Sequence, residues 1–394
     1  MTKQAIRLQL LRLAGAVLCR LAPKADLPAT PAPAILVIRP DHLGDVLLTL
    51  PAIDRLVGGI PGARITVAAG PWGSAAFGTH PDYEVLAWPF PGFSRAPAGG
   101  LRPYLLLLRY GLSLRRSGRY QMALIMRPDH WWGALLAAVA GIPVRIGYRT
   151  PETAPFLTDA LPHAPGRHAV EDSLTLVGAA LARARVPHTR ESSAALVLPR
   201  VSSAADEQSL TELLNAAGVG REPLIVLHPG SGSPLKSWPT DHFAKVGAEL
   251  AEATEARLVV TGSAAEAPLA SALCAALPEG TLNLAGRLQW PMLEALLARA
   301  CLVVGVDSGP LHLAVAAGTP SVALFGPADP VQFGPWGSPS MHRVVAADLP
   351  CIPCRRLDVC RLEPQGTEPP PCMRAISTGT VVAAARAALA EGSL

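Results

Sequence analysis

The sequence predicts an α/β protein made of two doubly wound domains, each a parallel sheet covered by helices. Three observations predict this class. Short apolar runs of strand length alternate with longer stretches of helical period in both halves of the chain. Polar turns rich in small residues follow several of these runs directly. The chain has 394 residues, half of them apolar, which is enough for two cores and excludes a disordered protein.

The first domain is expected over residues 34–200. Its predicted strands are residues 34–39, 64–69 and 122–126. Long helical stretches, such as residues 46–57, separate the strands in the order of a parallel sheet. The tetrad Arg-Pro-Asp-His occurs at residues 39–42 and again at 127–130, each time directly after a predicted strand. Either the repeat is chance, or it marks two equivalent strand ends that face one crevice.

The second domain is expected over residues 201–378, after a linker rich in Pro, Ser and Thr near residues 186–205. Its predicted strands are residues 224–227, 257–261, 281–284, 301–306 and 321–325. A helix is predicted from about Pro239, and residues 379–394 are expected to form a terminal helix. Two such domains that face each other across a central cleft are the simplest architecture for this pattern.

Residues 1–33 are a basic extension in which charges recur among leucines and alanines. No apolar run there reaches the roughly 18–20 residues that a membrane-spanning helix needs. The recurring arginines also differ from an export signal, whose charges stay near its start. The pattern is typical of an amphipathic helix that lies in a membrane surface. A helix packed on the protein itself is the alternative.

Charge is distributed unevenly. Residues 1–200 carry 22 Lys and Arg against 12 Asp and Glu, whereas residues 201–394 carry 12 against 18. This asymmetry predicts an acidic partner for the first half. No acid occurs between Glu84 and Asp129, although that stretch holds seven arginines. Leucines at 105–108, rather than aromatic residues, accompany them, which favours an anionic lipid or glycolipid surface over nucleic acid. A solvated helix face is the alternative.

The segment Arg39-Pro40-Asp41-His42-Leu43-Gly44-Asp45 follows the first strand and carries two carboxylates. Gly44 permits a tight turn, and Asp45 is expected at the start of a helix. A carboxylate there can accept a proton from an incoming hydroxyl group. An N-terminal helix cap is the alternative role for Asp45. Asp41 competes for the role of base, but its position favours a turn.

Residues 228–239, His-Pro-Gly-Ser-Gly-Ser-Pro-Leu-Lys-Ser-Trp-Pro, follow the strand at 224–227. Small residues expose backbone N–H groups, and the hydroxyls of Ser231 and Ser233 with the ammonium of Lys236 would complete a diphosphate site. The glycine-to-lysine spacing differs from that of a P-loop. A flexible loop with a solvated lysine is the alternative.

Residues 307–312, Asp-Ser-Gly-Pro-Leu-His, follow the strand at 301–306 and precede a helical pattern. Asp307, Ser308 and Gly309 therefore meet a helix N-terminus at the carboxyl end of a strand. Open α/β sheets bind phosphorylated ligands at such places, because unpaired N–H groups and the helix dipole favour an anion. A plain turn capped by Asp307 is the alternative.

Taken together, these segments resemble glycosyltransferase family 9, the heptosyltransferases that transfer heptose from ADP-heptose to the lipopolysaccharide inner core. The resemblance covers roughly residues 34–378 and rests on four blocks in the family's order. They are Arg39-x-Asp41-x-x-Gly44-Asp45 through Pro51, His228-Pro229-Gly230 through Lys236-x-Trp238-Pro239, Asn283-Leu284-Ala285-Gly286, and Val306-Asp307-Ser308-Gly309 through His312 with Phe325-Gly326-Pro327. The extension before residue 34 departs from this pattern.

The resemblance implies a GT-B fold of two Rossmann-like domains and an inverting transfer that uses neither metal nor cofactor. It implies that Asp45 is the general base and that Lys236, with Ser231 and Ser233, neutralises the departing diphosphate. Asp307 would bind donor hydroxyl groups. The amides of Ser308 and Gly309, with His312, would surround the phosphates.

The partners implied are a nucleotide-sugar donor, an anionic glycolipid acceptor and the inner-membrane surface, and the expected location is the cytosolic face of that membrane. Two other functions stay open at this point. One is a nucleotide-sugar 2-epimerase of the same fold, and the other is a non-catalytic member of a surface-polysaccharide assembly. Donor identity, exact acceptor and oligomeric state do not follow from the residues.

Four cysteines lie close together in a segment at 351–372, at positions Cys351, Cys354, Cys360 and Cys372. A Cys-x-x-Cys pair is half of a familiar zinc site. A structural zinc ion held by these four residues is therefore one interpretation. Free thiols packed in a loop are the favoured one, because a reducing cytosol disfavours disulfides.

Overall fold

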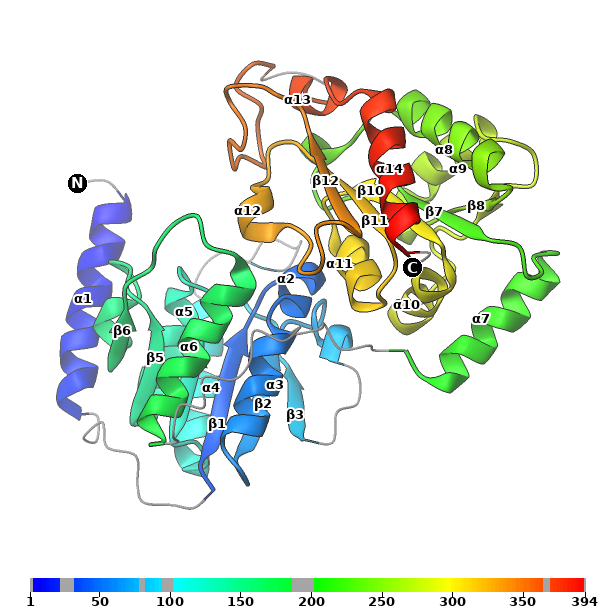
Figure 1. Ribbon diagram of the computed structural model, residues 1–394. Coiled ribbons are helices and arrows are strands. Elements are labelled where there is room, and N and C mark those ends of the chain that lie inside the picture. The colour runs from blue at the N-terminus through cyan, green and yellow to red at the C-terminus, as the bar shows by residue number, and fades with distance from the viewer. Residues whose placement is uncertain are drawn as a thin grey trace. The chain divides into compact units, whose positions relative to one another are not determined.

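The computed structural model describes residues 3–21, 32–77, 82–91, 93, 102–185, 202–363 and 369–392 (Figure 1). The chain divides into two compact units, Met1–Ala194 and Ala195–Leu394. Each contains a six-stranded sheet in which all neighbouring strands are parallel. The α/β prediction with two parallel sheets is confirmed. Most of the expected linker lies outside the described residues.

The sheet of unit 1 has the strand order β3-β2-β1-β4-β5-β6. Its strands are β1 Ala34–Arg39, β2 Arg64–Ala69, β3 Tyr83–Ala87, β4 Met122–Ile125, β5 Val144–Tyr148 and β6 Asp159–Leu161. Its helices are α1 Lys3–Leu21, α2 Leu43–Leu47, α3 Leu50–Gly59, α4 Arg102–Ser117, α5 Trp131–Val139 and α6 Ala169–Arg183, with the 3-10 turns η1 Ser74–Phe77 and η2 Ala154–Phe156. The order reverses between β1 and β4, which is where sheets of this kind bind ligands.

The core of unit 1 forms because its central strand, β1, is apolar up to Arg39 at its end. All six residues of β1 are buried. One face of β1 shares an apolar cluster with α1, α4 and α5, in which Leu36 and Ile38 join Leu11, Leu107 and Trp132. Helices α1 and α4 both pack on α5, while α3 packs on α6. Helices α1, α4 and α5 therefore form one layer.

The helical pattern at residues 46–57 is divided in the structure. Helix α2 ends at Leu47, and α3 begins at Leu50 with Pro51 in its first turn. Proline fits the first turn of a helix because it has no N–H to donate. It cannot continue an existing helix without removing a hydrogen bond. The break therefore separates the short helix that carries Asp45 from the rest of the segment.

The sheet of unit 2 has the order β12-β11-β10-β7-β8-β9. Its strands are β7 Leu224–His228, β8 Arg257–Val260, β9 Leu282–Asn283, β10 Leu302–Val306, β11 Ser321–Phe325 and β12 His342–Ala346. Its helices are α7 Ala204–Ala216, α8 Thr240–Thr254, α9 Ala267–Ala275, α10 Trp290–Arg299, α11 Gly309–Ala316, α12 Pro330–Phe333, α13 Pro371–Arg374 and α14 Thr378–Gly392, with the turns η3 Pro234–Lys236 and η4 Ala264–Glu266. Here the order reverses between β7 and β10.

The last helix completes the core of unit 2. Helix α14 packs on α8 and on strands β11 and β12, and buries Val381 and Ala385. Trp238 is buried beside it and donates from Nε1 to the Ile376 carbonyl at 3.2 Å. This contact anchors the end of the loop after β7. Among the described residues, no helix is long and apolar enough to cross a membrane.

Candidate active site

In unit 1, the end of β1 positions Asp45 in the first turn of α2. His42 occupies the N-cap position of that helix, so the alternative role of Asp45 as the cap is wrong. Arg39 is buried and donates from Nη2 to the Asp45 carbonyl at 3.2 Å, and Thr49 Oγ1 donates to the same carbonyl at 3.0 Å. The Asp45 side chain remains 32% exposed, with Oδ1 4.0 Å from Arg39 Nη2. Its backbone is fixed while its carboxylate is accessible.

The two Arg-Pro-Asp-His tetrads meet at adjacent strand ends. β1 pairs with β4, and Arg127 follows β4. Asp41 is buried between the two arginines: Arg39 Nε lies 3.0 Å from Asp41 Oδ2, and Arg127 forms a second ion pair with the same carboxylate. Arg127 also contacts Asp129, with Nε 2.6 Å from Oδ1. The two tetrads thus lie at neighbouring strand ends, as one interpretation of the repeat predicted. That they face one crevice stays a prediction.

The environment of Asp41 explains why it carries charge in the interior. Burial by itself would raise the pKa of Asp41, but the charges of Arg39 and Arg127 outweigh burial and hold that pKa below its ordinary value. Burial alone would lower the pKa of Arg127, but the carboxylates of Asp41 and Asp129 raise it above its ordinary value. Asp41 is therefore ionised and internally paired. Asp45, whose side chain is partly exposed, is the better candidate for a base.

His130 ends the second tetrad and is buried among aromatic rings. The rings of Phe90 and Phe93 each lie 5.5 Å from it in edge-on geometry. Neither of its ring nitrogens has a hydrogen-bond partner among the described residues. Burial lowers the pKa of His130 to about 4, so the ring is neutral at neutral pH. His130 therefore packs as a neutral side chain among these rings, just after β4.

In unit 2, Lys236 and Asp307 meet at the reversal of strand order. Lys236 ends the η3 turn after β7, and Asp307 follows β10, the neighbouring strand. Lys236 Nζ lies 2.6 Å from Asp307 Oδ2 and also donates to the Asp307 carbonyl at 3.4 Å. The side chain of Lys236 is 18% exposed and that of Asp307 is 8% exposed. The pair therefore lies at the edge of the interior, where a bound anion could reach the ammonium group.

Helix α11 begins directly after this pair. Ser308 occupies its N-cap position without a side-chain cap, and its hydroxyl donates instead to the Val306 carbonyl at 2.9 Å. The alternative role of Asp307 as the cap of α11 is therefore wrong. Gly309 opens the helix, and His312 is buried one turn further on. The positive end of the α11 dipole lies next to Lys236 and Asp307.

The hydroxyls of Ser231 and Ser233 form hydrogen bonds that shape the loop after β7. Ser231 Oγ donates to the Ser233 carbonyl at 2.6 Å. Ser233 Oγ donates to the Leu357 carbonyl at 2.8 Å and accepts from the Leu235 amide at 3.2 Å. These bonds fix the start of η3, which ends at Lys236. Both serines therefore hold the lysine in position in this structure.

Glu266 is a further residue of this region, and the sequence analysis assigned it no role. A Cβ atom added to Gly230 would clash with the Glu266 carboxyl group, so a larger residue at this position would push that side chain aside. The Glu266 carboxylate accepts from the Ser263 amide at 2.7 Å as part of a capping box. The spacing Ser263-x-x-Glu266 after a strand was the signal that could have revealed it. The amide of Gly286, in the third block, bonds to the Gly262 carbonyl at 2.8 Å and supports the same turn.

Comparison with known proteins assigns the family. The model described as glycosyltransferase family 9 (heptosyltransferase) matches residues 108–364. The chain belongs to glycosyltransferase family 9. It is 29% identical over 344 residues to lipopolysaccharide heptosyltransferase 1 of Pseudomonas aeruginosa, which covers 84% of this chain and 88% of that protein. It is 30% identical over 305 residues to lipopolysaccharide heptosyltransferase 2 of Escherichia coli, which covers 75% of this chain and 83% of that protein.

The fold of this family 9 glycosyltransferase agrees with solved structures. The structure of Escherichia coli ADP-heptose lipopolysaccharide heptosyltransferase II matches with a TM-score of 0.69 at 24% identity, covering 92% of this chain and 100% of that one. The expected fold class is confirmed. Because the chain is a glycosyltransferase, the 2-epimerase and non-catalytic alternatives are set aside.

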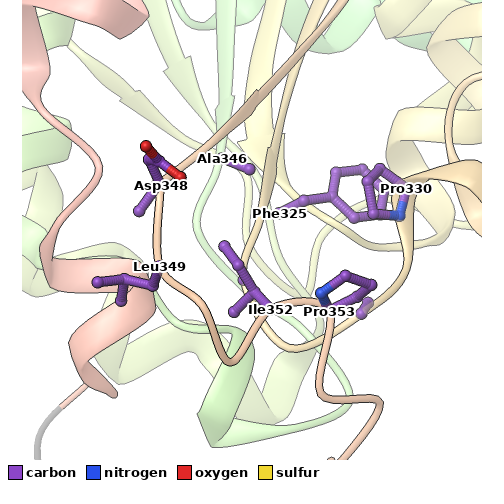
Figure 2. A pocket seen from close by; sticks show the side chains of 10 residues that line it. Phe325, Pro330, Ala346, Asp348, Leu349, Ile352 and Pro353 are labelled. Atoms are coloured by element: carbon purple, nitrogen blue, oxygen red, sulfur yellow. The ribbon is translucent and has the colours of Figure 1, made fainter.

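The glycosyltransferase has a further cavity in unit 2, of about 250 Å³, at the carboxyl ends of β11 and β12. Figure 2 shows Phe325, Ile352 and Pro353 at its wall, with Asp348 at the opposite side. None of the predicted site residues lines it. The cavity is lined by Phe325 and Gly326 of the fourth block, and neither Lys236 nor Asp307 is among its lining residues.

The four cysteines at 351–372 differ in exposure. Cys351 and Cys354 are exposed, Cys360 is half-buried and Cys372 is buried. Burial, with the neighbouring thiols of Cys354, Cys351 and Cys360, raises the pKa of Cys372 to about 11. Within the part of the chain that the structure describes, no three His, Cys, Asp or Glu side chains are placed to hold a metal ion. The zinc interpretation therefore gains no support, and free thiols stay the favoured prediction.

Proposed function

We propose that this glycosyltransferase transfers a heptose from ADP-heptose to an anionic lipopolysaccharide core acceptor, with inversion at the anomeric carbon. Two observations support the proposal. Its relatives are named lipopolysaccharide heptosyltransferases, and one of the similar solved structures is an ADP-heptose enzyme. The ion pair of Lys236 and Asp307 at the strand reversal of unit 2 is the observation that carries it.

In this proposal unit 2 binds the donor. The diphosphate lies against Lys236 and the N-terminus of α11, close to the amides of Ser308 and Gly309 and to His312, while the Asp307 carboxylate accepts hydrogen bonds from donor hydroxyl groups. Ser231 and Ser233 contribute by holding the loop that carries Lys236. Negative charge on the leaving diphosphate grows in the transition state. A fixed ammonium group and a helix dipole therefore stabilise the transition state more than the ground state.

Unit 1 supplies the base and the acceptor site. The Asp45 carboxylate removes the proton from the acceptor hydroxyl group as that oxygen attacks the anomeric carbon of the sugar. The bond from the anomeric carbon to the diphosphate oxygen breaks, and its electron pair leaves with ADP. A single displacement of this kind inverts the anomeric configuration. Arg39 supports the step by holding the backbone of Asp45 in place.

The transfer in this proposal uses no metal ion or other cofactor. Lys236 and the dipole of α11 supply the positive charge that a metal ion would otherwise bring to a departing diphosphate. The partners are the nucleotide-sugar donor and an anionic glycolipid, and the net positive charge of the first half of the chain suits that acceptor. We place the reaction at the cytosolic face of the inner membrane, with no role for nucleic acid.

A thermal-shift comparison of ADP, UDP, GDP and CMP tests the donor directly, because a ligand that binds the folded state raises the unfolding midpoint. We expect stabilisation by ADP, and a clearly smaller shift in Lys236→Met at the same ADP concentration. Transfer to a lipopolysaccharide core acceptor lacking heptose is then assayed with ADP-heptose. Stabilisation by another nucleotide and not by ADP would contradict the proposed donor.

A further inference from the structure

Helices α1 and α4 expose large apolar side chains to solvent. Seven of the twelve exposed large apolar residues in the described part of the chain lie on these two helices. They are Leu10, Leu13 and Val17 on α1, and Tyr104, Leu105, Leu108 and Leu112 on α4. Exposed fractions reach 65% at Leu13 and 63% at Leu105. A cluster of this kind marks an interaction site more often than scattered single residues do.

The exposed residues are additional to those that hold the helices on unit 1. Helix α1 buries Leu11, and its Gly15 lies so close to Pro155 that an added Cβ atom would clash with the proline ring and its carbonyl. Helix α4 buries Leu107 and Gly111. Both helices therefore already have a buried face. The exposed leucines form a second apolar stripe on each helix, spaced by three and four residues, which the fold itself does not use.

The charge on both helices has one sign. Neither α1 nor α4 contains an Asp or Glu residue. Their basic residues are Lys3, Arg7, Arg12, Arg20, Arg102, Arg109, Arg115 and Arg116. Arg109 and Arg116 are exposed beside the leucine stripe of α4. An acid-free pair of helices with leucine stripes and exposed arginines matches an anionic lipid surface in both apolar character and charge.

Trp131, at the start of α5, links the two helices. The guanidinium of Arg7 on α1 lies 5.9 Å from the Trp131 ring centre, and the ring of Tyr104 on α4 lies 6.4 Å from it. Both helices also pack on α5, and Figure 1 shows α1 at the outer edge of unit 1. The two stripes thus belong to a single layer of the unit.

We propose that the exposed faces of α1 and α4 form a docking surface for a bilayer of anionic phospholipid. The leucines enter the boundary between headgroups and acyl chains, and the arginines contact lipid phosphates. A second copy of this chain is a poorer occupant, because two acid-free basic faces would repel each other. The purpose of this surface rests on the proposed function: it would hold the enzyme at the membrane that contains its glycolipid acceptor. Binding to the bilayer itself does not depend on that function.

Vesicle flotation with the full chain tests the surface without donor or acceptor. We expect binding to vesicles of phosphatidylcholine mixed with phosphatidylglycerol, and none to phosphatidylcholine alone. The variant Leu105→Ser/Leu108→Ser/Leu112→Ser should lose at least about tenfold in affinity, since each leucine that no longer enters the bilayer forfeits apolar burial. Arg109→Gln and Arg116→Gln should each lose about fivefold. These residues are exposed, so folding is expected to survive.

Val344→Ser/Val359→Ser/Leu362→Ser is the matched control, because it removes three exposed apolar residues from unit 2 that have no part in the proposed donor site. It should bind vesicles like the wild type. The surface is refuted if wild-type binding does not depend on phosphatidylglycerol, or if the α4 variant binds as well as the control. It is also refuted if analytical ultracentrifugation shows that the wild type is a dimer and the α4 variant a monomer, because the exposed face would then bind a second copy of the chain. The ADP thermal shift, measured on the same proteins without vesicles, reports separately on the proposed function.

Discussion

Lys236 Nζ lies 2.6 Å from Asp307 Oδ2, although the two residues are 71 positions apart in the chain. The pair forms because β7 and β10 are neighbours in the sheet and end at the same edge. In the structure the ammonium group is neutralised by the carboxylate. A bound diphosphate must therefore share the ammonium group with Asp307, so the two residues are expected to respond differently to substitution.

Lys236→Met should weaken ADP binding by about 10- to 100-fold, because hydrogen bonds to charged groups contribute roughly 1.5–3 kcal/mol. Isothermal titration with ADP measures this effect. Lys245→Met, which removes an exposed lysine from α8, is the control and should bind as the wild type does. Unchanged ADP affinity in Lys236→Met would put the diphosphate elsewhere.

Asp307→Asn should keep or strengthen ADP binding, since it removes the carboxylate that competes for Lys236. The same variant should lose transfer activity if Asp307 binds donor hydroxyl groups, because an amide orients them differently. Parallel measurements of ADP affinity and of transfer separate the two effects. A large fall in ADP affinity would show that Asp307 holds the loop together and does not compete with the phosphates.

Most inner strands could be predicted from sequence, whereas most edge strands could not. The edge strand β9 is the exception, because it lies within the predicted strand at 281–284. The predicted strands at 34–39, 64–69 and 321–325 agree with β1, β2 and β11 residue for residue. Each is apolar over nearly its whole length and lies inside a sheet. The prediction missed β3, β6 and β12, which are edge strands with several partly or fully exposed residues. It also missed β5, because Arg145 interrupts the pattern and is buried by hydrogen bonds to backbone carbonyls, including that of Phe156 at 2.6 Å.

The sequence motifs predicted which segments carry the site residues. They did not predict which side chains from different segments contact one another. Asp45, Lys236 and Asp307 follow strands, so their place at sheet edges follows from parallel topology. The ion pair that joins Asp41 to Arg127 depends on β1 and β4 being neighbours, which the sequence pattern left open. The hydroxyl bonds of Ser233 depend on Leu357, a residue more than a hundred positions away. Such contacts follow from tertiary structure alone.

Stability should fall as the pH is lowered from 7 to 5, partly through His130. Its pKa is about 4 in the folded state and 6.5 in the unfolded chain. The unfolded chain therefore binds the proton first as the pH falls, and stability is lost between about pH 6.5 and 4. At pH 5 this loss amounts to about 2 kcal/mol.

His130→Leu should remove the part of the pH-dependent loss of stability that His130 causes. The substitution breaks no hydrogen bond, because neither ring nitrogen of His130 has a partner among the described residues. Urea titrations at pH 7 and pH 5 measure the free energy of unfolding of both proteins. The buried His228 and His342 titrate in both and cancel in the comparison. An equal loss of stability in wild type and variant would show that His130 is not neutral in the folded protein.

Transfer should persist after metal removal. If Lys236 and the N-terminus of α11 neutralise the leaving diphosphate, dialysis against EDTA should change the turnover rate by less than about twofold. Adding Mg²⁺ or Mn²⁺ afterwards should not raise the turnover rate. A rate that collapses in EDTA and returns with a divalent cation would show that a metal ion neutralises the diphosphate in place of the ammonium group.

The central claim is that the accessible carboxylate of Asp45 takes the proton from the acceptor. The most direct test compares Asp45→Asn with the wild type in two measurements: heptosyl transfer from ADP-heptose, and ADP affinity. Asn has nearly the same shape and cannot accept the proton, so transfer should fall by about 10²- to 10⁴-fold while ADP affinity stays within about twofold. Asp82→Asn, an exposed position in the same unit, serves as control and should transfer at the wild-type rate. Transfer by Asp45→Asn at close to the wild-type rate would contradict the account.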